Sequence, residues 1–246
     1  MRYFYFILFY SVQIFASTSD LKTLSFLDQN FRIGLGLSYS KLEAQSNVGN
    51  YYLLSSANPR IDLAYDTGAY NAFRQRFALY ILRELFRPEN DAFRVKSKNE
   101  QTNVGLSWQP MWVSEGEGFS YGLKFGLKSA SIISEIPNTT DVNGDVATRY
   151  SAESGVCFNW YGLTVSKFPL SVGAELLYSQ GLFDNSILTY KNGFLYRFSF
   201  EFDFKKKTLF SGWNVKGFYS YEDLENSYSH FVDKELGFTI NKVFPF

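Results

Sequence analysis

Two residue types that build many functional sites are almost missing from this sequence. The chain of 246 residues contains one cysteine, Cys157, and one histidine, His230. A single cysteine excludes an intramolecular disulfide framework, and a single histidine excludes a metal site built from several imidazoles. No glycine-rich phosphate loop or nucleotide motif is present either. We therefore expect neither a cofactor nor a bound metal.

An excess of charge and long apolar runs are lacking as well. The 24 basic residues balance the 24 acidic ones, so there is no electrostatic reason to expect nucleic acid as a partner. After residue 17 no run of 18 apolar residues occurs, and a membrane-spanning helix needs roughly 20. If the mature chain lies in a membrane, it must cross as a closed barrel, because lipid leaves backbone polar groups no partner in any other non-helical structure.

The N-terminus has the features of a secretion signal. Arg2 supplies a positive n-region, residues 3–15 are mostly apolar, and Ala16 completes an acceptable small-residue cleavage site. An anchor helix that stays attached is the alternative, but this apolar stretch is short for a membrane span. We predict a signal peptide over 1–16 and an outer-membrane β-barrel domain over 17–246.

Aromatic residues are abundant and alternate with polar ones. They make up 20% of the chain, with 26 Phe and 18 Tyr. Between Phe194 and Phe204 every second residue is Phe or Tyr, and the residues between them are mostly small or charged. Successive side chains of a strand point to opposite faces of its sheet, so this pattern predicts a strand with one wholly aromatic face. A transmembrane barrel presents such a face to lipid.

Similar alternation recurs along the chain and predicts an all-β, antiparallel up-and-down transmembrane barrel. Tight and longer connectors alternate, as expected when periplasmic turns are short and both termini are periplasmic. Residues 73–87 could also form an amphipathic helix, but a strand there keeps the strand count even. Pro59 and Pro110 predict bulges or strand ends, and Asn192-Gly193 is a hairpin-turn signal. The ten predicted strands are about 30–44, 51–67, 73–87, 93–113, 118–135, 148–161, 168–180, 188–204, 208–222 and 230–246.

The C-terminus carries the most specific motif. Phe246 is the last residue, and Phe244, Ile240 and Phe238 share its parity, whereas Lys242 and Pro245 depart from the pattern. This ending resembles the C-terminal sorting signature of bacterial outer-membrane barrel proteins. The resemblance covers about nine residues and implies recognition by the barrel-assembly machinery, location in the bacterial outer membrane and contact with its lipid.

The predicted inner face carries many charges of both signs. One hypothesis is a charged lumen that selects ions or small solutes; the other is a filled interior of ion pairs, because unpaired buried charge is costly. Barrels near eight strands are filled by side chains, whereas water channels occur at 16–18 strands, so the filled interior is favoured. The candidate lumen-lining residues are Arg32, Lys124, Lys128, Arg149, Glu153, Glu175, Arg197, Glu201 and Asp203.

His230 raises the hypothesis of an enzyme at the barrel rim. Ten-stranded outer-membrane proteases of the omptin type place His and Asp residues at the extracellular rim. Asp233 has the opposite parity to His230 on one predicted strand, so the two point to opposite faces. An enzyme would need an Asp or Glu from another strand within about 3 Å of His230. Without such a partner we predict no catalytic residue.

Taken together, the sequence predicts an integral outer-membrane barrel with a structural or surface-interaction role. The loop 137–147 is the expected contact surface for an extracellular ligand. Two alternatives stay open, a narrow porin-like channel and a rim enzyme that acts on protein or lipid. A soluble lipid-binding barrel is a further alternative, and it requires the aromatic face to point inward.

Overall fold

A computed structural model shows a closed barrel of ten antiparallel strands. It describes residues 29–46, 49–68, 70, 72–88, 94–95, 99–114, 118–135, 143–165, 168–182, 192–204, 212–225 and 229–246. No helix in these ranges is long and apolar enough to cross a membrane. The barrel strands are β1 (Gln29–Ser46), β2 (Gly49–Thr67), β3 (Phe73–Pro88), β5 (Glu100–Ser114), β6 (Phe119–Glu135), β7 (Asn143–Val165), β8 (Phe168–Gly181), β9 (Asn192–Asp203), β10 (Trp213–Glu225) and β11 (Ser229–Pro245).

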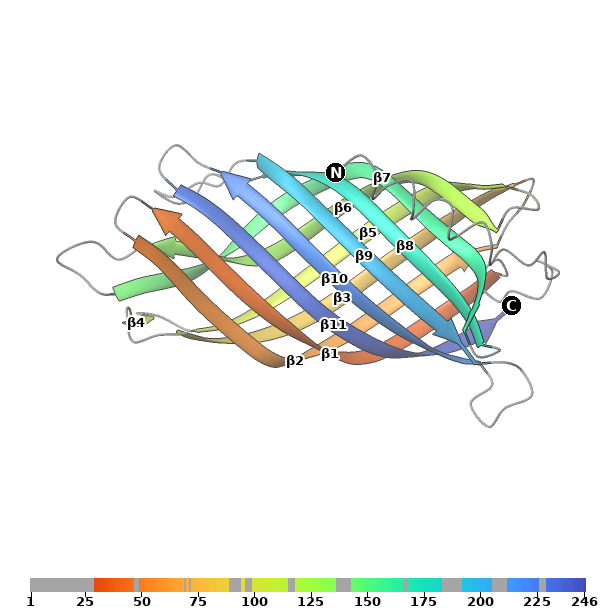
Figure 1. The fold of residues 1–246 in the computed structure, drawn as a ribbon, viewed down its shortest axis with the longest axis horizontal. Coiled ribbons are helices and arrows are strands. Elements are labelled where there is room, and N and C mark those ends of the chain that lie inside the picture. Colours follow the sequence, from red (N-terminus) through yellow and green to blue (C-terminus); the bar gives the residue numbers. More distant parts are fainter. Residues whose placement is uncertain are drawn as a thin grey trace.

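Each strand pairs with its neighbours in sequence, and the first strand pairs with the last (Figure 1). The β1–β11 ladder is continuous from Asn30↔Pro245 to Ser46↔Ser229, and the β7–β8 pairing completes the ring. The predicted antiparallel up-and-down barrel of ten strands is therefore confirmed. An additional short strand, β4 (Arg94–Val95), pairs in parallel with the start of β7 outside the barrel ladder.

The two ends of the barrel differ in their connectors. The terminal end, as we call it, contains Gln29 and the C-terminus, whose Phe246 N–H donates to the Gln29 carbonyl at 3.2 Å. The loop end is the opposite one, where β1, β3, β6, β8 and β10 end and where β4 pairs with the start of β7. In Figure 1 the C-terminus lies at the right and β4 at the left.

The aromatic and aliphatic face points outward on every barrel strand. Leu35 is 65% exposed and Phe198 is 55% exposed, whereas their chain neighbours on the other face are buried or half-buried. Such a large exposed apolar surface is unusual for a water-soluble monomer. The soluble lipid-binding barrel, which needs these side chains inside, is therefore wrong. The outward pattern is the one that lipid-facing barrels show.

Several predicted boundaries needed correction. The predicted strand at 73–87 is confirmed as β3. β9 begins at Asn192 rather than at 188, so the Asn192-Gly193 pair forms the start of the strand. The predicted loop 137–147 is shorter, since β7 already begins at Asn143. β5 begins at Glu100, and β10 runs from Trp213 to Glu225 instead of 208–222. The predicted signal peptide, 1–16, lies outside the described residues.

The two strand prolines behave differently. Near Pro59, β2 contains a bulge, with register shifts against both neighbours and a left-handed backbone at Ala57 (φ 56°). Pro110 causes no register shift, so the predicted bulge there is wrong. Instead β5 lies close against β6: a Cβ added to Gly122 would sit 2.1 Å from the Pro110 carbonyl oxygen. Glycine is required at 122 because of this close approach.

Candidate functional site

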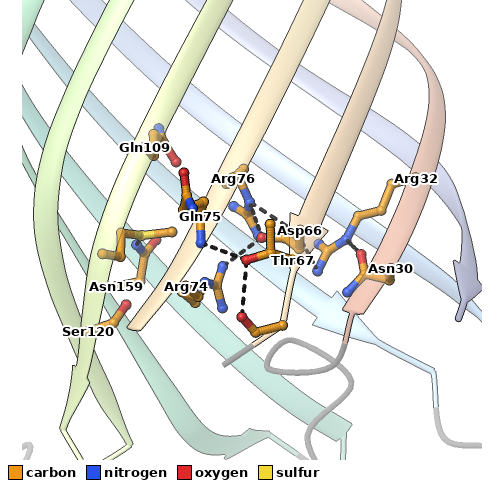
Figure 2. A network of polar contacts seen from close by, with 12 residues as sticks. Asn30, Arg32, Asp66, Thr67, Arg74, Gln75, Arg76, Gln109, Ser120 and Asn159 are labelled. Atoms are coloured by element: carbon orange, nitrogen blue, oxygen red, sulfur yellow. Dashed lines mark hydrogen bonds and ion pairs between the residues drawn. The ribbon is translucent and has the colours of Figure 1, made fainter. Parts of the chain in front are cut away.

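An ion-pair cluster fills the lumen near the terminal end. Asp66, which is 1% exposed, forms ion pairs with three guanidinium groups (Figure 2). Arg74 Nη2 and Arg76 Nε each lie 3.0 Å from Asp66 Oδ1, and Arg32 Nη2 lies 3.5 Å from Oδ2. Arg32 also pairs with Glu201. One carboxylate is thus surrounded by three cations from two neighbouring strands.

The local sequence explains why these side chains converge. Arg74 and Arg76 are two residues apart on β3, so both point into the lumen. Asp66 lies opposite Arg76 in the β2–β3 register, and Arg32 occupies the inner face of β1 on the other side. The register of three strands therefore places opposite charges together.

A second cluster centres on Glu175 of β8, midway along the barrel. Lys124 Nζ lies 2.7 Å from Glu175 Oε2, and Arg197 Nη1 lies 3.5 Å from the same oxygen. Gln109 Nε2 donates to Glu175 Oε1 at 3.0 Å. Its partners come from β5, β6 and β9, so the cluster links strands on both sides of β8.

Ion pairs also cross the lumen. Lys128 of β6 bonds Glu222 of β10 (Nζ–Oε2, 2.7 Å) and Glu153 of β7 (Nζ–Oε1, 2.8 Å). Arg149 Nη1 lies 3.1 Å from the other Glu222 oxygen. Three strands separate β6 from β10 along the shorter way around the barrel. The Lys128–Glu222 bridge therefore obstructs the lumen instead of lining its wall.

Arg60 adds a mixed polar and aromatic contact. Its Nε bonds Asp62 Oδ1 at 2.8 Å, and its Nη1 bonds Glu235 Oε1 at 2.9 Å. The guanidinium carbon lies 4.4 Å from the ring centre of Tyr80 and 4.5 Å from that of Phe218. A cation between two ring faces is stabilised by both quadrupoles, so this side chain occupies the lumen in one position.

The space that these side chains leave is small. One interior cavity of about 110 Å³ is lined by charged residues of several strands, among them Arg76, Lys124, Arg197 and Lys216. A buried site of this size has room for a few water molecules. The interior is polar but nearly filled, as expected for a barrel close to eight strands.

A hydrophobic cluster closes the loop end. It contains buried apolar residues from seven strands, most of which point into the lumen. Leu53, Phe86 and Ile133 are each 0% exposed. Cα atoms of β1 and β6 come within 8 Å of each other, although at least three strands separate them in either direction around the barrel. The opposite walls therefore approach each other across the lumen. The cluster comprises Leu42, Ala44, Tyr51, Leu53, Phe86, Ile132, Ile133, Val146, Leu224 and Phe231.

The structure places the predicted lumen residues on the inner face, in the clusters described above. Asp203, the last residue of β9, follows Glu201 with the same parity at the terminal end. Cys157 is buried on the inner face, 1% exposed. The residues of the C-terminal motif point outward, and Phe238, Ile240, Phe244 and Phe246 are all exposed. Their proposed role in assembly depends on the resemblance alone.

His230 lies on the outer face of the loop end, and it has partners that the sequence analysis missed. Its Nε2 lies 2.5 Å from Asp223 Oδ1 of β10, which meets the condition of a carboxylate from another strand within about 3 Å. Glu225 is directly opposite His230 in the β10–β11 register. Asp233 points into the lumen, where it is surrounded by buried residues of other strands. The sequence feature that could have predicted the contact of His230 with β10 is the short connector 226–228, because a hairpin there pairs residue 225 with residue 230.

Comparisons with known proteins place the fold but not the family. No known protein family and no curated protein matches the sequence. The structure is similar to that of the outer-membrane protease OmpT from Escherichia coli, with a TM-score of 0.55, 10% identity, and coverage of 94% of this chain and 100% of that one. It is also similar to an outer-membrane channel from Pseudomonas putida F1, with a TM-score of 0.50, 10% identity, and coverage of 92% and 99%. The chain therefore has the fold of bacterial outer-membrane β-barrels.

Proposed function

We propose that the protein is an integral barrel of the bacterial outer membrane with a closed lumen and a structural or surface-interaction role. The terminal end faces the periplasm and the loop end faces the outside, in keeping with the longer connectors there. Lipid surrounds the exposed apolar face, and the assembly machinery inserts the chain during biogenesis.

The observation that carries this proposal is the hydrophobic cluster at the loop end. A water-filled passage needs polar or open space along its whole length, whereas this cluster is apolar and nearly fully buried. Below it, the Lys128–Glu222 bridge spans the lumen. Either barrier alone opposes ion flow, because a bare ion in a low-dielectric constriction loses hydration worth several kcal/mol or more.

The test is planar-bilayer conductance of the purified protein. Its folded state is first checked by heat-modifiable gel mobility, and a general porin serves as the conducting control. We expect insertion without discrete current steps. Reproducible steps of uniform size would overturn the closed lumen and favour the narrow channel. In that event, a change in ion selectivity on Lys124→Gln or Arg197→Gln would identify the conducting path.

A rim enzyme is the second candidate, and one observation favours it. The Asp223–His230 pair has the contact that orients an imidazole as a general base. The pair faces outward on the barrel wall, so its substrate would have to approach along that wall. Hydrolysis of a labelled protein or lipid substrate that is lost in both Asp223→Asn and His230→Gln would support this function. Equal rates in the variants and the parent would exclude it.

A further inference from the structure

The outer wall of the loop end brings three potential metal ligands together. Asp223 and Glu225 lie at the end of β10, two residues apart on the same face, and His230 lies near the start of β11. The β10–β11 register pairs Glu225 with His230. We propose that these three side chains bind one divalent transition-metal ion.

The geometry fits one ion. One ligand atom from each residue lies within 4.8 Å of the other two. Ligands at about 2.1 Å from a tetrahedral zinc ion are roughly 3.4 Å from one another. The side chains of His230 and Asp223 are 33% and 36% exposed, so rotations toward the solvent side can close the remaining difference. The backbone register that holds them needs no change.

The charge balance at the site also calls for a cation. In the described part of the chain, the only ion-pair partner of Asp223 is His230, and Glu225 has none. The nearby Lys234 instead bonds Glu43 at 2.8 Å. In the lumen, by contrast, carboxylates such as Glu175 and Glu222 each meet two cations. A divalent ion would supply the compensating charge that the described residues do not place beside Asp223 and Glu225.

The donor set selects the class of metal. One imidazole nitrogen with two carboxylate oxygens suits zinc and its neighbours among the first-row transition metals. Calcium and magnesium favour sites made of oxygen ligands alone. Three protein ligands leave a fourth position for water or another exchangeable ligand. The site therefore resembles an open metal centre more than a closed structural one.

The position of the site gives ions access from the external solution. On β11 the residues of outward parity change from Phe238 and Leu236, which are exposed apolar residues, to Lys234, the buried Val232 and then His230. His230 is six residues beyond Leu236, which corresponds to about 15 Å along the membrane normal for a strand tilted by about 45°. The ligands thus lie above the apolar belt. Binding there does not depend on whether the lumen conducts.

The single histidine makes the test direct. Untagged protein, extracted from membranes and labelled with isotopes in histidine, gives one imidazole signal, that of His230. We expect Zn²⁺ to shift this signal saturably, with one ion bound per chain. Asp223→Asn and Glu225→Gln should each weaken binding by about tenfold or more, the scale seen when groups around a metal are altered. Glu43→Gln, a carboxylate change on the same outer wall, should leave the affinity unchanged.

Three outcomes would overturn the proposal. The first is the absence of any shift up to about 1 mM Zn²⁺. The second is unchanged affinity in both carboxylate variants, which would mean coordination by a lone imidazole. The third is an equal loss of affinity in Glu43→Gln, which would mean diffuse attraction to a negative surface. Isothermal titration of His230→Gln completes the set, and it should show no saturable binding of Zn²⁺.

Discussion

Replacement of Asp66 by asparagine tests whether the lumen is held by paired charge. The change keeps the shape of the side chain but leaves Arg32, Arg74 and Arg76 beside a neutral group. Each charge pair at about 4 Å contributes about 4 kcal/mol at an effective dielectric constant of 20. The variant no longer pays for burying a charged carboxylate, which offsets much of the lost attraction between Asp66 and the three arginines. Breaking a buried ion pair by removing one partner typically lowers the free energy of unfolding by about 3–5 kcal/mol. We expect a loss of this size for Asp66→Asn, which raises the equilibrium constant of unfolding by a factor between about 10² and more than 10³.

The assay is urea-induced unfolding in lipid vesicles, followed by tryptophan fluorescence and by gel mobility. The matched control is Glu100→Gln, which breaks the outer-wall pair with Arg83, whose side chains are 46% and 63% exposed. Exposed pairs contribute about 0–1 kcal/mol. A double change of Asp66→Asn with Arg74→Gln removes one of the unpaired cations and should recover about 1 kcal/mol or more. If Asp66→Asn lowers the free energy of unfolding by no more than about 1 kcal/mol beyond the control, paired charge does not hold the lumen together.

Two further predictions concern packing and assembly. Gly122→Ala should lower the free energy of unfolding by about 1–3 kcal/mol in the same assay, because the added Cβ would lie 2.1 Å from the Pro110 carbonyl oxygen. In the control Gly126→Ala the nearest atom to the added Cβ is 3.2 Å away, so this change should cost clearly less. Equal losses of stability in the two variants would contradict the close approach of β5 and β6 at Gly122. Phe246→Ala, which keeps the backbone hydrogen bond to Gln29 and removes a side chain that is 77% exposed, should reduce the heat-modifiable form in cell membranes severalfold while the urea midpoint of refolded protein stays nearly the same. A fall in the midpoint without a fall in assembly would assign Phe246 a packing role instead.

The strands were predictable because their signal is local. Alternation with a period of two appears in stretches such as Phe194 to Phe204, and it determines which face is apolar without knowledge of any other strand. The abundance of aromatic residues favoured an outward, lipid-facing direction for that face, but a soluble barrel with the face turned inward stayed open until the exposure of residues such as Leu35 and Phe198 decided between them. The predicted ends of strands were less accurate, as at β10. A strand extends only as far as a neighbouring strand pairs with it, and the sequence of one strand does not show where its neighbour ends.

The pairings across the lumen were not predictable. Lys128 and Glu222 are far apart in sequence, and their meeting depends on the stagger of all strands around the barrel. The apolar residues Leu42 and Ala44, by contrast, continue the inward parity of Ser38 and Ser40. This parity can be read from the sequence, although the sequence alone led to no prediction that the polar lining ends before the strand does.

The site at His230 was missed for a related reason. The predicted strand 208–222 ended before Asp223, so Asp223 had no defined face. Once β10 extends to Glu225, the parity of Asp223 and Glu225 and the short connector to β11 fix both carboxylates beside the imidazole. The error therefore lay in the boundary of one strand and not in the chemistry of the residues.

The pairing of β1 with β11 also has a consequence for the order of folding. Its partners are the first and the last strand of the barrel, so this ladder cannot form until β11 has been synthesised, and contacts of such high sequence separation are the slowest to close. Until then both strands are unpaired edges, which are templates for aggregation. The chain therefore depends on something that shields two open edges at once, from the emergence of Gln29 to the arrival of Pro245. A fragment that lacks either strand keeps two edges open permanently and should not accumulate as a stable barrel.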